Sequence, residues 1–230
     1  MRKILVGVVA VVVGLGLVLP GGAMAADKKE ADLKVQEATL AVKKFLSVPD
    51  VKAARWLLKR SLAVAIFPGM VKAGFVIGGR FGRGVIVKRL DDGTFSGPAF
   101  FTIGGANVGF QIGAESTDLF MFIIHQKGLN GILHNKLKFG VDASVAAGPV
   151  GRQAEASLSA ASLKADIYSY SQSKGLYAGA VLEGAGIEFD KDMTRAYYGR
   201  PVSVKQIFDG KVKVPPSGRE LARVLVELAK

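Results

Sequence analysis

The sequence contains no cysteine and only two histidines among its 230 residues. Without cysteine, the chain cannot form disulfides, use a thiolate nucleophile or hold a metal through a cysteine thiolate. The two histidines, His125 and His134, have no carboxylates at the spacing of a zinc site. No G-x-S-x-G segment marks a serine nucleophile. We therefore expect a protein that is not an enzyme and that uses no metal or cofactor.

The sequence also lacks, at its amino terminus, an apolar run long enough for a spanning helix. The run at residues 4–19 has about 16 residues, whereas a span requires roughly 20. Basic residues 2–3 precede it and an A-x-A site at residues 23–25 follows, which is the pattern of a secretory signal cleaved after Ala25. We expect a signal peptide at residues 1–25 and a periplasmic or secreted protein that can associate peripherally with membrane. An uncleaved anchor is the alternative, and lipid attachment at a cysteine is excluded.

Acidic residues are scarce relative to basic ones. The chain has 31 Lys and Arg against 19 Asp and Glu, so its formal charge is +12, and near +10 without Arg2 and Lys3. Such a balance favours anionic partners, such as lipid head groups, phosphates, acidic polymers or nucleic acid. Outside the cytoplasm we expect no nucleic acid, whereas anionic membrane lipid is always near. Solubility alone is the other explanation for the charge.

Residues 26–230 are expected to form a single domain, because no linker or low-complexity stretch divides them. Helical periodicity predicts a helix over residues 31–46, with Leu33, Leu40 and Phe45 on one stripe. Asp50 is suited to cap a second helix that runs to about Lys59. A short helix is predicted at residues 126–135, a helical turn at residues 192–198, and a final helix at residues 218–229 with Leu221, Leu225 and Leu228 on its apolar stripe.

Between these helices the chain is rich in short β-type segments. Residues 62–67 end at Pro68-Gly69, which predicts a turn, and residues 91–93 predict a hairpin loop. Further segments lie at residues 71–79, 81–89, 95–104, 108–112, 118–125 and 144–189. Glycines inside them indicate bulges, bends or close backbone approach. We therefore predict an α+β fold: a strongly curved, mainly antiparallel, Gly-rich β-sheet or barrel-like sheet with N-terminal helices and a C-terminal helix.

The second predicted helix carries the clearest binding signal. At about 100° per residue, one side gathers a tryptophan and four cations, which are Lys52, Arg55, Trp56, Lys59 and Arg60. The opposite side has Val51, Ala54, Leu57 and Leu58. Cations around an indole ring suit an anionic membrane surface, and each contributes about 1 kcal/mol there. The alternative is a solvated helix face with Trp56 packed on a neighbour.

Three more cations, Lys72, Arg80 and Arg83, are included with the predicted lipid-binding residues. Arg80 and Arg83 lie in the glycine-rich residues 78–84, and such turns can present backbone N–H groups to phosphate. The segment lacks both the P-loop ending and the order of a dinucleotide site. We favour a tight β-turn as its role.

Acidic residues also occur in strand-like segments, namely Asp166, Glu183, Glu188 and Asp190. They could act as an acid–base pair or bind a cation. Such residues are more often edge charges or partners of Arg and Lys, and we favour that interpretation.

Six ordered blocks of sequence resemble the SYLF domain, the lipid-binding, actin-regulating family of eukaryotic SH3- and FYVE-containing proteins and of bacterial secreted proteins. The blocks lie at residues 67–79, 96–100, 109–113, 148–152, 168–176 and 197–199. The resemblance covers about residues 33–228. One departure is Phe95, where the family often has Trp, so an aromatic side chain is retained.

The resemblance implies binding of phosphoinositides or other anionic lipids through a basic amphipathic N-terminal segment, which here corresponds to residues 50–61. It supplies no catalytic residues, and the family's actin role does not transfer simply to an exported protein. The sequence thus predicts a peripheral lipid-binding protein. The alternative is a non-catalytic structural or interaction module with an envelope protein partner.

Overall fold

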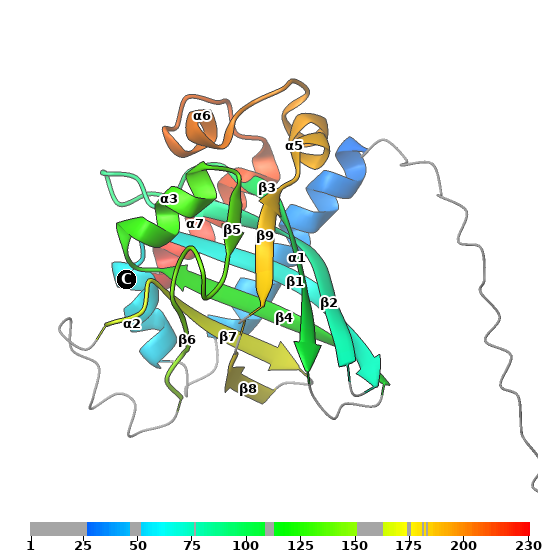
Figure 1. Ribbon diagram of the computed structural model, residues 1–230. Coiled ribbons are helices and arrows are strands. Elements are labelled where there is room, and N and C mark those ends of the chain that lie inside the picture. The colour runs from blue at the N-terminus through cyan, green and yellow to red at the C-terminus, as the bar shows by residue number, and fades with distance from the viewer. Residues whose placement is uncertain are drawn as a thin grey trace, which may run out of the picture.

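The computed structural model describes residues 27–46, 52–75, 77–108, 113–150, 163–173, 176–180, 182 and 184–230 (Figure 1). Its helices are α1 (Lys28–Leu46), α2 (Lys52–Arg60), α3 (Gln126–Leu133), α5 (Lys191–Tyr198), α6 (Val204–Phe208) and α7 (Pro216–Leu228). Its strands are β1 (Ala63–Phe75), β2 (Ile77–Lys88), β3 (Ala99–Val108), β4 (Gly113–Ile123), β5 (Lys136–Lys138), β6 (Val145–Ala147), β7 (Ile167–Ser173), β8 (Leu176–Gly179) and β9 (Ala185–Phe189). The predicted signal segment lies outside the described residues. Within them, no helix has the length and apolar character that a membrane span requires.

One curved sheet holds these strands together in the order β5-β9-β3-β2-β1-β4-β7-β6, with β8 paired to β7. The strand pairs are antiparallel except for β6 with β7. Strands β5 and β9 lie in front of the central strands in Figure 1, so the sheet curls back over its own inner face. The predicted α+β class and the strongly curved antiparallel sheet are confirmed.

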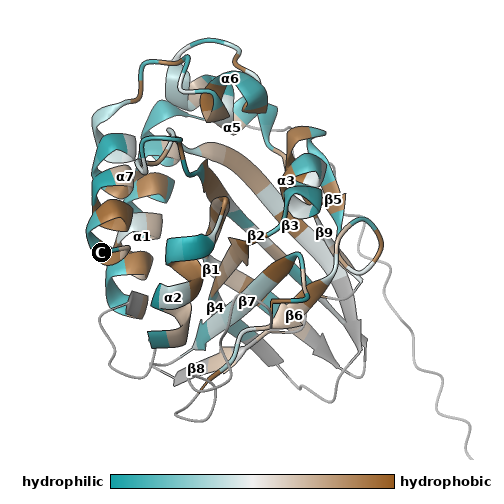
Figure 2. Ribbon diagram, turned by 90° about the vertical axis from the view of Figure 1, so that its left-hand side faces the viewer, coloured by the Kyte–Doolittle hydropathy of each residue, from teal (hydrophilic) through white to brown (hydrophobic). Residues whose placement is uncertain are grey.

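Apolar side chains cover both faces of the sheet. Helices α1, α2 and α7 lie on the convex side (Figure 2), and they enclose an outer core with the sheet. The sheet residues of the outer core are Val64, Ile66, Val85, Val87, Phe100, Phe120, Phe122, Tyr168 and Tyr170. The concave side encloses an inner core that α3 and α6 help to close, with Phe67, Phe101, Ile103, Met121, Leu137 and Ile187 among its members. The alternation of side chains along each strand separates the two cores.

Helix α1 packs on the sheet through small residues. Its buried positions recur at helical spacing, and they are Ala31, Val35, Ala38, Val42 and Phe45. Leu33 and Leu40 are exposed, so the predicted stripe joining them to Phe45 is wrong. Phe45 faces the sheet instead, where its ring stacks on Phe120 with centroids 4.2 Å apart. Small side chains let the helix axis approach the sheet closely, and this packing overrides the simple rule that leucines are buried.

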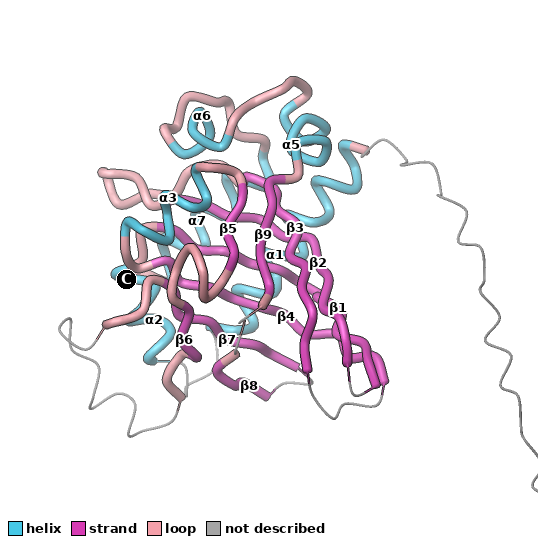
Figure 3. The backbone as a smooth tube through the Cα atoms, viewed as in Figure 1, coloured by secondary structure: helices cyan, strands magenta, loops and turns pink. Residues whose placement is uncertain are grey.

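Two predicted turns lie within strands. Strand β1 continues through Pro68-Gly69, where a β-bulge separates Phe67 from Met70 and Gly69 takes a φ of +63° (Figure 3). The Gly69 N–H donates to Asp118 Oδ1 at 2.8 Å, which supports the bulge. Residues 78–84 likewise lie inside β2 and form no turn. Long strands crossing a strongly curved sheet need such bulges and glycines, so the same residues fit a bend as well as a turn.

The predicted helices at residues 126–135 and 218–229 correspond to α3 and α7, and the predicted helical turn at residues 192–198 is helix α5. The loop at residues 91–93 connects β2 to β3. Helix α6 was not predicted. Its signal in the sequence is the capping box of Ser203 and Gln206, in which each side chain bonds the other residue's backbone N–H. The predicted strand at residues 108–112 falls mostly outside the described residues.

Candidate basic lipid-binding site

Helix α2 presents its cations to solvent and its apolar side to the outer core. Ala53, Ala54, Leu57 and Leu58 are buried. Lys52, Arg55, Lys59 and Arg60 are exposed on the other side of the helix. The structure therefore brings these four predicted site residues together on one surface, which we call the α2 basic face. Val51, also predicted for the apolar side, lies outside the described residues.

Arg89, at the end of the β2 segment, fixes the carboxyl end of α2. Its Nη2 donates to the backbone oxygen of Leu58 at 2.6 Å, and its Nε donates to that of Ser61 at 3.2 Å. Its guanidinium also lies 4.7 Å from the centroid of the Phe95 ring. Burial lowers the pKa of Arg89 from its ordinary value. These bonds satisfy carbonyls that a helix end leaves unpaired, so they hold α2 and its basic face in a fixed orientation.

Trp56 lies between the basic face and the core. Its ring is half-buried and packs against the outer core, while the Arg60 guanidinium sits 3.8 Å from the ring centroid. Lys59 Nζ donates to the backbone oxygen of Lys230 at 2.5 Å, so the end of the chain lies beside α2. Packing of the ring on a neighbour matches the alternative we considered for Trp56, whereas the surrounding cations face solvent. A cation–π contact of this kind stabilises an Arg side chain over the ring.

Lys72 and Arg80 lie elsewhere, toward the far ends of β1 and β2. They are direct cross-strand partners, and Lys72 also pairs in register with Glu115 on β4. Burial, followed by the charge of Arg80, lowers the pKa of Lys72, while Glu115 acts to raise it; burial also lowers the pKa of Arg80. Because α2 leads into the opposite end of β1, these cations do not join the α2 basic face (Figure 1).

Arg83 lies on the convex face, where it forms ion pairs with two acidic side chains. Its Nη1 lies 3.0 Å from Glu30 Oε1 on α1, and its Nε lies 3.4 Å from Asp190 Oδ2 before α5. These ion pairs connect β2 to two helices. Arg83 is thus paired with acidic side chains of the same chain, and the eight predicted site residues fall into three separate groups.

The acidic residues in strand-like segments are mostly engaged with cations or backbone groups. Asp190 also caps α5 by accepting from the Met193 N–H at 3.0 Å, and Glu188 lies 3.5 Å from Lys136. Burial acts to raise the pKa of Asp166, but two hydrogen bonds from Ser144 and the charges of Lys127 and His125 outweigh it and lower that pKa. Glu183 lies outside the described residues. Across the part of the chain that the structure describes, no three His, Asp or Glu side chains gather in a way that could hold a metal ion.

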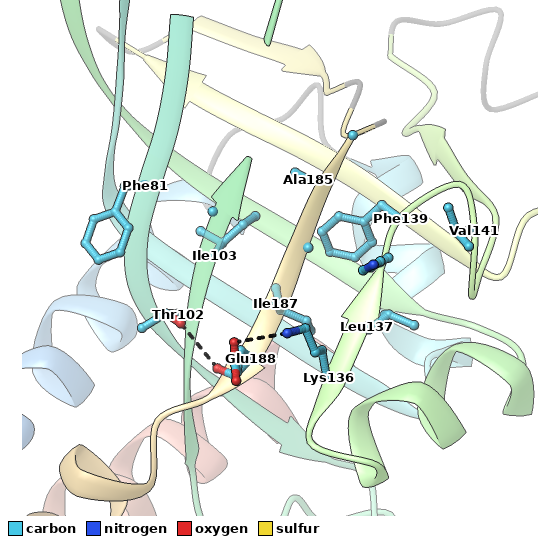
Figure 4. A pocket seen from close by; sticks show the side chains of 14 residues that line it. Phe81, Thr102, Ile103, Lys136, Leu137, Phe139, Val141, Ala185, Ile187 and Glu188 are labelled. Atoms are coloured by element: carbon cyan, nitrogen blue, oxygen red, sulfur yellow. Dashed lines mark hydrogen bonds and ion pairs between the residues drawn. The ribbon is translucent and has the colours of Figure 1, made fainter. Parts of the chain in front are cut away.

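A groove of about 510 Å³ was not predicted (Figure 4). It is lined by parts of β2, β3, β5 and β9, with Phe81, Val141 and two glycines, Gly104 and Gly186, among its residues. The sequence signal is the position of these glycines in neighbouring strands. Only the strand register, which the sequence does not supply, shows that they lie side by side.

Comparison with known proteins identifies the family. Residues 104–228 match the family model described as Ysc84: Las17-binding protein actin regulator. Protein YSC84 of Saccharomyces cerevisiae is 40% identical over 172 residues, which are 74% of this chain and 36% of that protein. LAS seventeen-binding protein 3 from the same species is 42% identical over 180 residues, 77% of this chain and 38% of that protein.

A vertebrate relative extends the match. SH3 domain-containing YSC84-like protein 1 of Xenopus laevis is 30% identical over 197 residues, covering 83% of this chain and 58% of that protein. The chain thus spans well under half of the yeast relatives and somewhat over half of the frog relative. No solved structure matches. The family description names regulators of actin and no enzymatic activity. Together with the curved sheet and its flanking helices, these matches show that the chain belongs to the Ysc84 family, the proteins of the SYLF domain.

Proposed function

We propose that this protein is a peripheral lipid-binding protein that recognises anionic phospholipid or phosphoinositide-like head groups through the α2 basic face. We further propose that it works in the periplasm or outside the cell after loss of residues 1–25, which rests on the sequence of that segment. The observation that carries the lipid proposal is the set of four exposed cations, Lys52, Arg55, Lys59 and Arg60, on a helix whose other side is fixed in the core.

The proposed binding is mainly electrostatic. Each basic residue close to an anionic surface contributes about 1 kcal/mol, so four of them give useful but reversible attachment. Trp56 keeps its packing against the core, with Arg60 over its ring. The cations, rather than an inserted indole, therefore supply the affinity. Lys72 and Arg80 add positive charge toward the other ends of β1 and β2.

Co-sedimentation with vesicles tests this proposal. The parent protein is expected to pellet with vesicles containing phosphatidylglycerol, to stay in solution with phosphatidylcholine vesicles, and to be released by salt, because charge interactions at a surface are screened within about 8–10 Å. The variant Lys52→Glu, Arg55→Glu, Lys59→Glu should remain in the supernatant.

A matched control separates the site from net charge. The variant Lys191→Glu, Arg200→Glu, Lys213→Glu makes the same change in charge at exposed positions near α5 and α6, which lie away from α2 (Figure 1). It should pellet nearly as well as the parent protein. Equal pelleting of the α2 variant and the parent, or equal loss in both variants, would contradict the assignment to α2. Circular dichroism confirms that each variant is folded.

A second candidate function is a protein-interaction module, with an envelope protein as its partner. The observation that favours it is the name of one relative, LAS seventeen-binding protein 3, which states a protein partner for that protein. It predicts no dependence on anionic lipid at any salt concentration. Crosslinking would then recover a partner protein, and the α2 and control variants would behave alike toward vesicles.

A further inference from the structure

A row of paired residues across β2, β3, β9 and β5 creates a bare strip on the sheet. Phe81 pairs with Gly104, Gly104 with Gly186, and Gly186 with Lys138. Directly paired residues in a sheet point to the same face, so two neighbouring glycines leave that face without side chains between Phe81 and Lys138. The face is the convex one, since Arg83 on the same side of β2 contacts α1. We call this strip the glycine trough.

Aromatic and aliphatic side chains border the glycine trough. Figure 4 shows Phe81 on one side and Val141 on the other. Phe81 is 59% exposed and Val141 is 75% exposed, although both are large apolar residues. The volume of about 510 Å³ lies within the usual range for small-ligand pockets. A Cβ added at Gly104 would meet no atom within 4 Å, so open space lies directly above this residue.

The polar groups of the trough gather at its borders. Lys136 Nζ lies 3.5 Å from Glu188 Oε2, and Thr102 Oγ1 donates to the Glu188 backbone oxygen at 3.4 Å (Figure 4). Lys138 is exposed and makes no ion pair with the residues that the structure describes. The lining therefore carries two lysines against one glutamate. An apolar strip with cations at its border is complementary to a molecule with an apolar body and an anionic head.

The backbone of the floor disfavours a peptide ligand. β3 pairs with both β2 and β9, and β9 pairs with both β3 and β5. Their backbone groups are thus used within the sheet, so an added peptide strand would find no ladder of donors and acceptors there. A hydrocarbon chain needs no such partners, and a floor without side chains admits an unbranched one.

We propose that the glycine trough binds one unbranched acyl chain of an anionic amphiphile, with the carboxylate or phosphate of that molecule next to Lys138 and Lys136. A free fatty acid and a lysophospholipid share this chemistry. The choice of a lipid ligand rests on the proposed function, but the site is separate from α2 and binds a single molecule rather than a bilayer surface.

Fluorescence titration with cis-parinaric acid, a fluorescent fatty acid, tests the proposal on the full chain. The parent protein should give saturable enhancement of emission. Gly104→Leu places a side chain in the trough, and its Cβ meets no atom within 4 Å, so we expect a loss of about tenfold in affinity as methylene contacts are displaced. Gly79→Leu is the matched control, because it adds the same side chain to the same face of the sheet outside the trough. Its Cβ makes only an ordinary contact of 3.9 Å with the Gly105 backbone oxygen, and the variant should bind like the parent protein.

The head-group position is tested with Lys138→Met. This variant should bind the fatty acid more weakly and a fatty acid methyl ester as well as the parent protein does. Displacement of the probe by monomeric lysophosphatidylglycerol would assign the site to a lysophospholipid, whereas displacement by oleate alone would assign it to free fatty acid. Equal weakening for acid and ester would contradict the placement of the anionic head.

The two lipid proposals fail independently. The α2 variant that loses vesicle binding should still bind cis-parinaric acid like the parent protein. If Gly104→Leu and the parent bound the probe equally, or the parent showed no saturable binding, the trough proposal would be overturned even with vesicle binding intact. If the parent bound the probe but never pelleted with vesicles, the α2 proposal would be the one to fall.

Discussion

The convex face of the sheet has two regions that differ in what covers them. Under α1, α2, α5 and α7 it carries large side chains in close contact, such as Phe45 against Phe120 at 4.2 Å and Phe100 against Tyr197 at 5.2 Å between ring centroids. Beyond these helices it carries the glycine trough. An uncovered sheet face is ordinarily polar, because it meets water. A bare glycine floor beside an exposed Phe81 departs from that pattern, which is why we assign the region a ligand rather than only solvent.

The largest effect on stability that depends on only one of the two regions is expected at alkaline pH, because the buried tyrosine hydroxyls lie in the covered region. Burial raises the pKa of Tyr197 to about 12, and burial also raises the pKa of Tyr170 and of Tyr198. The folded state therefore retains protons that the unfolded chain releases from about pH 10, so stability is lost as pH rises from about 10 to about 12. Each such group contributes a slope of about 1.4 kcal/mol per pH unit.

Urea denaturation at stepped pH measures this loss. Tyr197→Phe should show a shallower fall over the same interval, because one of the titrating groups is gone. A flat urea midpoint from pH 10 to 12 would contradict the burial of these hydroxyls.

Truncating one aromatic ring in each region gives the next largest contrast. Phe45→Ala removes a fully buried ring from the covered region and should cost about 3–5 kcal/mol of unfolding free energy. Phe81→Ala removes an exposed ring beside the trough and should cost about 0.5 kcal/mol or less. Urea unfolding of both variants checks the comparison. A large loss for Phe81→Ala would show that this ring supports the fold and is not reserved for a ligand.

Substitution of two adjacent glycines of β3 compares the two faces of the sheet. A side chain at Gly104 would face the trough, and one at Gly105 would face the opposite side of β3. A Cβ at Gly105 would lie 2.5 Å from the Ala185 Cα and 2.9 Å from the Gly184 backbone oxygen, so Gly105→Ala should cost about 1–3 kcal/mol. Gly104→Ala should be neutral or stabilising by about 0.4–1 kcal/mol, because it meets open space and restricts the unfolded chain. Thermal unfolding distinguishes them, and equal costs would mean that the trough is not open.

The smallest effect should come from the ion pairs at the border of the covered region. Arg83→Met removes the contacts with Glu30 and Asp190. The side chain is partly exposed, so we expect a cost of about 0.2–1 kcal/mol that shrinks in high salt. Urea midpoints at low and high salt measure this change. A loss that salt leaves unaltered would assign Arg83 to packing rather than charge.

The sequence predicted the architecture better than it predicted the details within it. Short apolar segments with glycines inside them were enough for a curved antiparallel sheet, and helical periodicity was enough for α7. The predictions from the sequence were wrong where one local pattern is compatible with two different structures. Pro68-Gly69 fits both a turn and a bulge, and only pairing of β1 with two neighbours decides for the bulge. Leu33 and Leu40 were expected in the core because a sequence does not show how closely α1 approaches the sheet.

Only the part of the candidate site that lies within one helix could be predicted from the sequence. Helical periodicity alone placed Lys52, Arg55, Lys59 and Arg60 on one side of α2, and they share that exposed side in the structure. Arg83 was grouped with them on charge, but its partners Glu30 and Asp190 come from distant segments. The trough escaped prediction for the same reason, since Gly104 and Gly186 become neighbours only through the register of β3 and β9.

Hydrogen–deuterium exchange with and without anionic vesicles tests most directly whether α2 is the membrane-docking element. On addition of phosphatidylglycerol vesicles, backbone amides of α2 should exchange more slowly, those of α6 should be unchanged, and high salt should remove the protection. Protection that appears on α6 or along β5 and β9 while α2 exchanges at its free rate would contradict the account.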